Sequence, residues 1–127
     1  MAGRLLLSSF CVVAILLLHC SALLPPPPVS RVCVDNNAGF DLHWALKDLN
    51  TNIVGPDSGS YPIDQTRCQA IDTVAGVLSN HLIQTTVYAD GGVSHDTDSA
   101  VFYSPNSTNT ATFTCTGTTL DYSCSLN

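Results

Sequence analysis

The stretch FDLHWALK, residues 40–47, carries the clearest pattern in the sequence, because apolar and polar side chains alternate along it. Successive side chains of a β-strand point to opposite faces of a sheet, so the stretch predicts a strand with one apolar and one polar face. Asp41 and His43 are expected on the outer, solvent-facing side. The side chains expected to face the core are Phe40, Leu42, Trp44 and Leu46.

The same alternation returns near the C-terminus over residues 111–116 and 120–126, with a turn expected at 117–119. Turn-forming Gly, Pro, Asn and Asp residues separate further segments with strand character. We expect these strands over 29–34, 65–74, 82–89 and 100–103, with a short piece at 52–54 and a helical turn within 70–78. The spacing predicts an all-β fold: a single small antiparallel β-sandwich of about seven strands, stapled by two disulfides.

Composition narrows the class of protein. The 127 residues suffice for one domain, and ten acidic residues, all of them Asp, outweigh four Lys and Arg to give a net charge of −6. This balance argues against nucleic acid or an anionic membrane as partner, because both bind basic patches. With 45% hydrophobic and 11% charged residues, the chain is too apolar for a disordered tail.

The N-terminus has the organisation of a secretory signal peptide. A short basic start is followed by an apolar run over residues 5–18. The segment Cys20-Ser21-Ala22 then offers small residues at the two positions that a signal peptidase reads, with cleavage expected after Ala22. We expect residues 1–22 to be removed, residues 23–29 to form a Pro-rich linker, and residues 30–127 to form the sandwich. The protein is therefore predicted to be secreted, with no stable membrane span, because the apolar run is shorter than the roughly 20 residues that a bilayer requires. An uncleaved anchor over residues 5–24 and a lipoprotein acylated at Cys20 are the alternatives.

Four cysteines remain after cleavage, and an even number in a secreted chain predicts two disulfides. Cys115 and Cys124 fall on the same face of one predicted hairpin, so we expect them to pair. That leaves Cys33 to pair with Cys68. A zinc site is the alternative, but the sequence contains no pair of cysteines at the short spacing that such sites use.

An Asp-rich segment, residues 90–98, follows the strand predicted at 82–89. Asp90, Asp96 and Asp98 offer carboxylate oxygens, and the last two are spaced like alternate ligands in calcium loops. Calcium is therefore a candidate cofactor, although the closing Glu of an EF-hand is absent. A solvated turn without metal explains the same residues, because Asp and Gly favour turns.

Histidine suggests further candidate sites. Asp41 and His43 lie on the same outer strand face, where a carboxylate and an imidazole could bind a metal or act as an acid–base pair. His43, His81 and His95 could also converge on one zinc ion if the fold brought them together. An ordinary exposed strand face is the alternative.

Three short patterns complete the candidates. Asp57-Ser58-Gly59 matches the triplet of aspartic proteases, but the preceding Gly55-Pro56 makes a β-turn an equally good explanation. Asn106-Ser107-Thr108 is an N-glycosylation sequon in a polar loop, which predicts a glycoprotein. Aromatic residues could form a sugar-stacking platform. Trp44 and Tyr122 are expected in the core, which leaves Tyr61, Tyr88 and Tyr103 for such a platform.

One segment has a counterpart in known families. VDNNAGF, residues 34–40, is similar to the first hairpin of thaumatin-like and aegerolysin-type proteins. The resemblance covers seven residues and implies a small β-sandwich and, for the aegerolysins, activity on membranes. The dense cysteine framework of thaumatin-like proteins is missing, and no functional residue is carried over.

These observations favour a non-enzymatic binding module that recognises an extracellular ligand, such as a surface glycan or a protein, through loops 90–98 and 104–109. The alternative is a small secreted hydrolase that uses Asp41 and His43 or the carboxylates of residues 90–98. A third hypothesis is an aegerolysin-like protein that acts on neutral lipid membranes.

Overall fold

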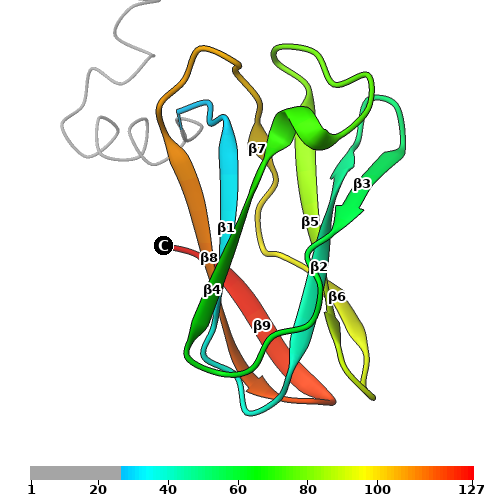
Figure 1. Ribbon diagram of the computed structural model, residues 1–127, viewed down its shortest axis with the longest axis vertical. Helices are drawn as coiled ribbons and strands as arrows, with labels where there is room; N and C mark the ends of the chain where they lie inside the picture. Colours follow the sequence, from blue (N-terminus) through cyan, green and yellow to red (C-terminus); the bar gives the residue numbers. More distant parts are fainter. Residues whose placement is uncertain (1–26) are drawn as a thin grey trace, which may run out of the picture.

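The computed structural model describes residues 27–127 as two β-sheets packed face to face (Figure 1). The four-stranded sheet has the order β4-β1-β8-β9, and the five-stranded sheet has the order β3-β2-β5-β6, with β7 also paired to β5. The first sheet comprises β1 (Arg31–Asn36), β4 (Gln65–Ala70), β8 (Thr110–Thr118) and β9 (Asp121–Leu126). The second comprises β2 (Leu42–Asp48), β3 (Ile53–Asp57), β5 (Leu82–Ala89), β6 (Ser94–Asp96) and β7 (Val101–Phe102).

The predicted β-sandwich is confirmed, and the alternating stretch behaves as expected. Leu42, Trp44 and Leu46 of β2 are fully buried between the sheets, whereas His43 and Lys47 are half-buried on the outer face. Burying each large apolar side chain contributes about 1.5–3 kcal/mol, so this strand anchors the core. The predicted signal peptide, residues 1–22, lies outside the described residues.

The structure differs from the expected strands in three places. β1 and β8 run parallel, whereas every other named strand pair is antiparallel. A parallel pair needs a long crossover, and here the chain passes through the second sheet before it returns as β8. Residues 94–96, expected as part of a loop, form the short strand β6. The strand expected over 65–74 ends at Ala70, because the 3-10 helix Ile71–Thr73 follows it, within the range where a helical turn is expected.

Both predicted disulfides are present, and each joins directly opposed residues of neighbouring strands. Cys33 pairs with Cys68 across β1 and β4, and Cys115 pairs with Cys124 across β8 and β9. The chain-entropy model assigns about 4 kcal/mol to the longer loop and about 3 kcal/mol to the shorter one. Both staples hold the four-stranded sheet, so the disulfides leave the five-stranded sheet to be held by packing and hydrogen bonds.

Buried hydrogen bonds connect the two sheets at the end that carries the candidate site. The Tyr61 hydroxyl accepts from Trp44 Nε1 (2.9 Å) and donates to the Val34 carbonyl of the opposite sheet (2.7 Å). The side chain of Asn36 is fully buried, and its Nδ2 donates to the carbonyls of Phe40 (2.8 Å) and Tyr61 (3.1 Å). These satisfied polar groups fix how the two sheets meet.

Candidate functional site

Two aromatic rings stand side by side on the outer face of the five-stranded sheet. His43 of β2 and Tyr88 of β5 are direct cross-strand partners, which places both side chains on one face. Their ring centroids lie 4.9 Å apart with an angle of 14° between the planes, so the rings are stacked. Tyr88 is half-buried and 30% of the His43 side chain is exposed, so both can contact a ligand.

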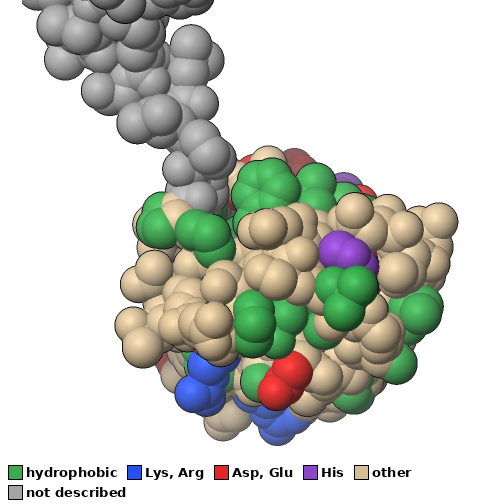
Figure 2. Space-filling view, turned by 90° about the horizontal axis from the view of Figure 1, so that it is seen from above, with side chains coloured by type: hydrophobic (Ala, Val, Ile, Leu, Met, Phe, Trp, Pro, Cys, Tyr) green, Lys and Arg blue, Asp and Glu red, His purple; other side chains and the backbone are tan. Residues whose placement is uncertain are grey.

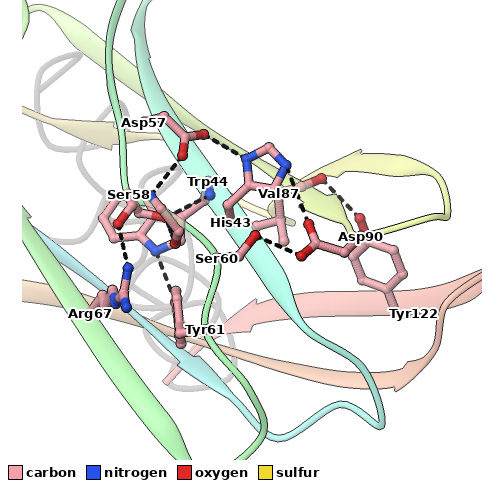
Figure 3. A network of polar contacts seen from close by, with 11 residues as sticks. His43, Trp44, Asp57, Ser58, Ser60, Tyr61, Arg67, Val87, Asp90 and Tyr122 are labelled. Atoms are coloured by element: carbon pink, nitrogen blue, oxygen red, sulfur yellow. Dashed lines mark hydrogen bonds and ion pairs between the residues drawn. The ribbon is translucent and has the colours of Figure 1, made fainter.

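Two carboxylates from different parts of the chain flank His43 (Figure 3). Asp57 is the last residue of β3, and Asp90 lies in the turn that follows β5. His43 Nδ1 lies 2.6 Å from Asp57 Oδ1, and Nε2 lies 3.7 Å from Asp90 Oδ1. The second oxygen of Asp90 accepts a hydrogen bond from Ser60 Oγ (2.7 Å). About half of the Asp57 side chain and 41% of the Asp90 side chain are exposed, so the cluster is open to solvent.

Local turns hold these carboxylates in place. Asp57 Oδ2 accepts from the Gly59 N–H (2.7 Å), as Asp commonly does where a turn follows a strand. Gly59 adopts a positive φ of 74°, a backbone conformation that favours glycine at this turn. The Asp90 N–H donates to the Asp41 carbonyl (2.9 Å), which brings the β5–β6 turn against the start of β2.

A rigid layer lies beneath this cluster. Ser58 Oγ accepts from the Trp44 N–H (2.9 Å), and Arg67 Nη1 donates to the Ser58 carbonyl (2.8 Å). The Arg67 guanidinium also lies over the Tyr61 ring, 4.9 Å from its centroid. Burial raises the pKa of Tyr61 to about 12, so its hydroxyl keeps its proton and remains a donor at neutral pH. The site therefore rests on support that does not titrate near neutrality.

The charge state of the cluster follows from its hydrogen bonds. Burial raises the pKa of Asp57, but hydrogen bonds from His43 and from the Gly59 N–H outweigh it and hold the pKa below its usual range. Asp57 is therefore an acceptor at neutral pH, and Nδ1 of His43 carries the proton. When the imidazole is neutral, its Nε2 is an acceptor that faces Asp90 Oδ1, another acceptor. Toward Asp90 the cluster thus presents acceptors only, and a bound hydroxyl or amino group would supply the donor.

Asp57 and Asp90 contact opposite nitrogens of the same ring, so the three side chains do not converge on one point. Within residues 27–127, no group of three or more His, Cys, Asp or Glu side chains is arranged to hold a metal ion. The predicted zinc ligands are separated as well: His81 hydrogen-bonds to Asp48 (2.6 Å), and the ring of His95 meets the edge of Tyr122 at 4.8 Å.

The candidate calcium ligands each have a different partner. Asp90 belongs to the His43 cluster, and Asp96 accepts from Thr86 Oγ1 (2.6 Å). Asp98 Oδ1 accepts from the Leu126 N–H (3.1 Å), which ties this loop to β9. The structure thus gives these carboxylates protein hydrogen-bond partners, and calcium binding by them stays a prediction.

The other predicted site residues are distributed as follows. Asp41 is exposed and contributes its carbonyl to the site, so the carboxylate that contacts His43 comes from Asp57 and not from the expected neighbour. Of the aromatic residues, Tyr61 and Tyr103 are buried, which leaves Tyr88 for a sugar platform. Trp44 and Tyr122 belong to the core, as predicted. Asn106 is exposed in the loop between β7 and β8, where a glycan would meet solvent.

No protein-family model, curated protein sequence or solved structure matches this chain. The resemblance of residues 34–40 to the aegerolysin and thaumatin-like hairpins therefore stays a prediction. No helix within residues 27–127 is long and apolar enough to cross a membrane.

The grouping of His43 with Asp57 and Asp90 was missed by sequence reasoning. The sequence presents the two carboxylates in separate contexts: Asp57 in a triplet that fits either an aspartic protease or a turn, and Asp90 in a loop that fits calcium, a hydrolase site or a solvated turn. The useful signal was the turn chemistry at the strand ends, because Pro56-Asp57-Ser58-Gly59 and Asp90-Gly91-Gly92 lie at the ends of β3 and β5, which the structure places in the same sheet.

Proposed function

We propose that this protein is a secreted, non-enzymatic binding module that recognises a surface glycan through His43, Tyr88, Asp57 and Asp90. The observation that carries the proposal is the stacked ring pair with carboxylates on both sides, on an open sheet face. Aromatic faces stack on the apolar face of a sugar ring, and carboxylates accept from its hydroxyls. A neutral glycan supplies the donors that this acceptor-rich site lacks and avoids the repulsion that an acidic ligand would meet.

Secretion and glycosylation are part of the same proposal. Two disulfides indicate that the chain folds in an oxidising compartment. The signal-peptide pattern over residues 1–22 supports export, and the exposed Asn106 supports glycosylation. Mass spectrometry of the secreted protein, before and after removal of N-glycans, tests both: the N-terminus should be Leu23, and Asn106 should be converted to Asp by the glycan-removing amidase.

A glycan array probed with the purified protein tests recognition. We expect the wild type to bind a restricted set of neutral glycans, and Tyr88→Ala to lose at least about fivefold in affinity, because one stacking contact contributes roughly 1 kcal/mol or more. Phe102→Ala is the matched control, since Phe102 is an aromatic residue of β7 with 38% exposure. The proposal is wrong if the wild type binds no glycan, or if Tyr88→Ala and Phe102→Ala bind equally well.

One observation favours a second candidate, hydrolysis by acid–base catalysis. Asp57 orients the His43 ring in the way that a carboxylate orients a catalytic imidazole, which leaves Nε2 free to activate water. Ser60, however, donates to Asp90, and no hydroxyl or thiol within the described chain hydrogen-bonds to His43. Turnover of chromogenic esters or glycosides that disappears in His43→Gln would favour this candidate over the binding module.

A separate surface supports the third hypothesis, contact with a neutral lipid membrane. The end that carries the β2–β3 turn exposes Leu78 (64%) and Val54 (56%). Figure 2 looks onto this end and shows hydrophobic side chains in several separate groups among polar atoms. Leakage from sterol-containing neutral liposomes, lost in Leu78→Ser, would support membrane activity, and an absence of leakage would contradict it.

A further inference from the structure

A groove of about 440 Å³ lies along the start of β8, away from the His43 cluster. Its apolar walls come from both sheets and from the segment before β1: they are formed by Val29, Val101, Ala111 and Leu126. Thr110 and Thr112 of β8 lie on its polar side. None of its lining residues carries a charged side chain, although residues 23–127 contain ten Asp against three Lys and Arg, a net charge of −7.

The groove exposes a strand edge. β9 pairs with β8 from Phe113 onward, because Phe113 lies opposite Leu126, the last residue of β9. Figure 1 shows the C-terminal end of the chain meeting β8 partway along its length. On its other side, β8 pairs with β1 from Thr110 itself. Thr110 and Ala111 therefore have a strand neighbour on one side and the groove on the other, whereas Thr112 still contacts Asn127 on the groove side.

The direction of the backbone groups follows from hydrogen bonds along β8. The carbonyls of Asn109 and Cys115 accept from residues on the β1 side, at 3.2 and 2.9 Å. The Thr112 carbonyl accepts from the Asn127 N–H (2.9 Å) on the opposite side. Because backbone groups alternate in direction along a strand, Thr110 directs its N–H and carbonyl to the same side as Thr112, into the groove.

We propose that this groove binds an extended peptide segment of a partner protein, which adds to the four-stranded sheet beyond the end of β9. The Thr110 N–H and carbonyl would continue the ladder, and the apolar walls would take small branched side chains. The lining has no charged side chain and the protein as a whole is acidic, so both features favour a segment without acidic residues. This site is independent of the proposed glycan site.

Amide hydrogen exchange and NMR on the secreted protein test the proposal with a defined probe. The probe is an acetylated, amidated peptide of alternating valine and threonine with one lysine at its start. We expect the Thr110 N–H to exchange rapidly in the free protein and at least about tenfold more slowly with saturating peptide. The same peptide with a central proline is the control and should not protect Thr110, because proline cannot complete the ladder.

A pair of variants distinguishes backbone pairing at the strand edge from nonspecific hydrophobic binding of the peptide. Thr110→Pro removes the N–H that faces the groove, and proline is tolerated at the first residue of a strand. Thr110→Val keeps this N–H. We expect the first variant to lose peptide binding by about tenfold or more and the second to bind as the wild type does.

Three outcomes would overturn the proposal. The first is equal binding by Thr110→Pro and Thr110→Val, and the second is no shift at residues 110–112 with millimolar peptide. The third is a Thr110 N–H already protected in the free protein, which would mean that the chain itself fills the groove. The exchange measurement on the wild type needs no variant, so it tests peptide binding at Thr110 even if Thr110→Pro fails to fold.

Discussion

Two Asp–His pairs in this protein have the same contact distance and opposite surroundings. His43 Nδ1 lies 2.6 Å from Asp57, and His81 Nδ1 lies 2.6 Å from Asp48. About half of the Asp57 side chain is exposed, whereas Asp48 is fully buried and its histidine is 17% exposed. The contact alone therefore does not assign a role, and solvent access decides whether such a pair can meet a ligand.

The buried pair connects the end of β2 to the β2–β3 turn and to the start of β5. Asp48 ends β2, and its second oxygen accepts from the Asn50 N–H (2.9 Å), which shapes the β2–β3 turn. Asn50 Oδ1 in turn accepts from the Leu82 N–H at the start of β5 (2.9 Å). Through His81, the same carboxylate holds the segment before β5. The exposed pair has its free ring edge toward Asp90 and solvent, which suits recognition.

Breaking the buried pair should have the largest effect. Asp48→Ala removes a buried carboxylate together with its hydrogen bonds, so the free energy of unfolding should fall by about 3 kcal/mol. Equilibrium denaturation with the disulfides intact measures it. A fall in the free energy of unfolding of less than about 1 kcal/mol would mean that the buried pair stabilises the protein no more than a surface pair does.

Acid should weaken the buried pair in a defined direction. Burial raises the pKa of Asp48, but hydrogen bonds from His81 and Asn50 outweigh it, so the pKa lies below its ordinary value of 3.8. The ionised carboxylate therefore adds stability above about pH 4, and this contribution is lost as the pH falls through the lowered pKa. Denaturation of wild type and Asp48→Asn from pH 6 to pH 2 should show a smaller acid loss in the variant. Parallel curves would contradict the assignment.

The exposed pair should contribute less to stability and more to binding. Asp57→Ala should change the free energy of unfolding by no more than about 1 kcal/mol, because solvent screens the pair. The same variant should lose glycan binding, because the His43 ring can reorient once the Asp57 carboxylate is removed. Denaturation and the glycan array together check this. A stability loss equal to that of Asp48→Ala would erase the distinction between the two pairs.

The smallest expected effect on stability concerns the hydrogen bond between Ser60 and Asp90. Ser60→Ala removes the hydroxyl that donates to Asp90, and the exposed position should limit the stability change to about 0.5 kcal/mol. The NMR chemical shift of His43 Nε2 should still detect it, because Asp90 becomes a better acceptor beside the ring once it has lost the hydrogen bond from Ser60. An unchanged Nε2 shift would show that Asp90 does not interact with the ring.

Much of the architecture could be predicted because it depends on local patterns. Alternation placed Leu42, Trp44 and Leu46 in the core, and strand position paired Cys115 with Cys124. β6 was missed because three exposed polar residues carry no periodic signal. The parallel pairing of β1 with β8 was missed because strand patterns do not encode direction.

The candidate site shows where local reasoning ends. The alternating pattern was enough to place His43 on the outer face, because strand periodicity is a property of the backbone. Which carboxylates would reach its ring depended on how β3 and the β5–β6 turn fold back along β2, so Asp57 and Asp90 replaced Asp41. Strand character, side-chain direction and disulfide partners follow from short-range geometry in this chain. The contacts among residues 43, 57 and 90 exist only once the two strand ends and the turn are packed together, since no local interaction links positions so far apart along the chain.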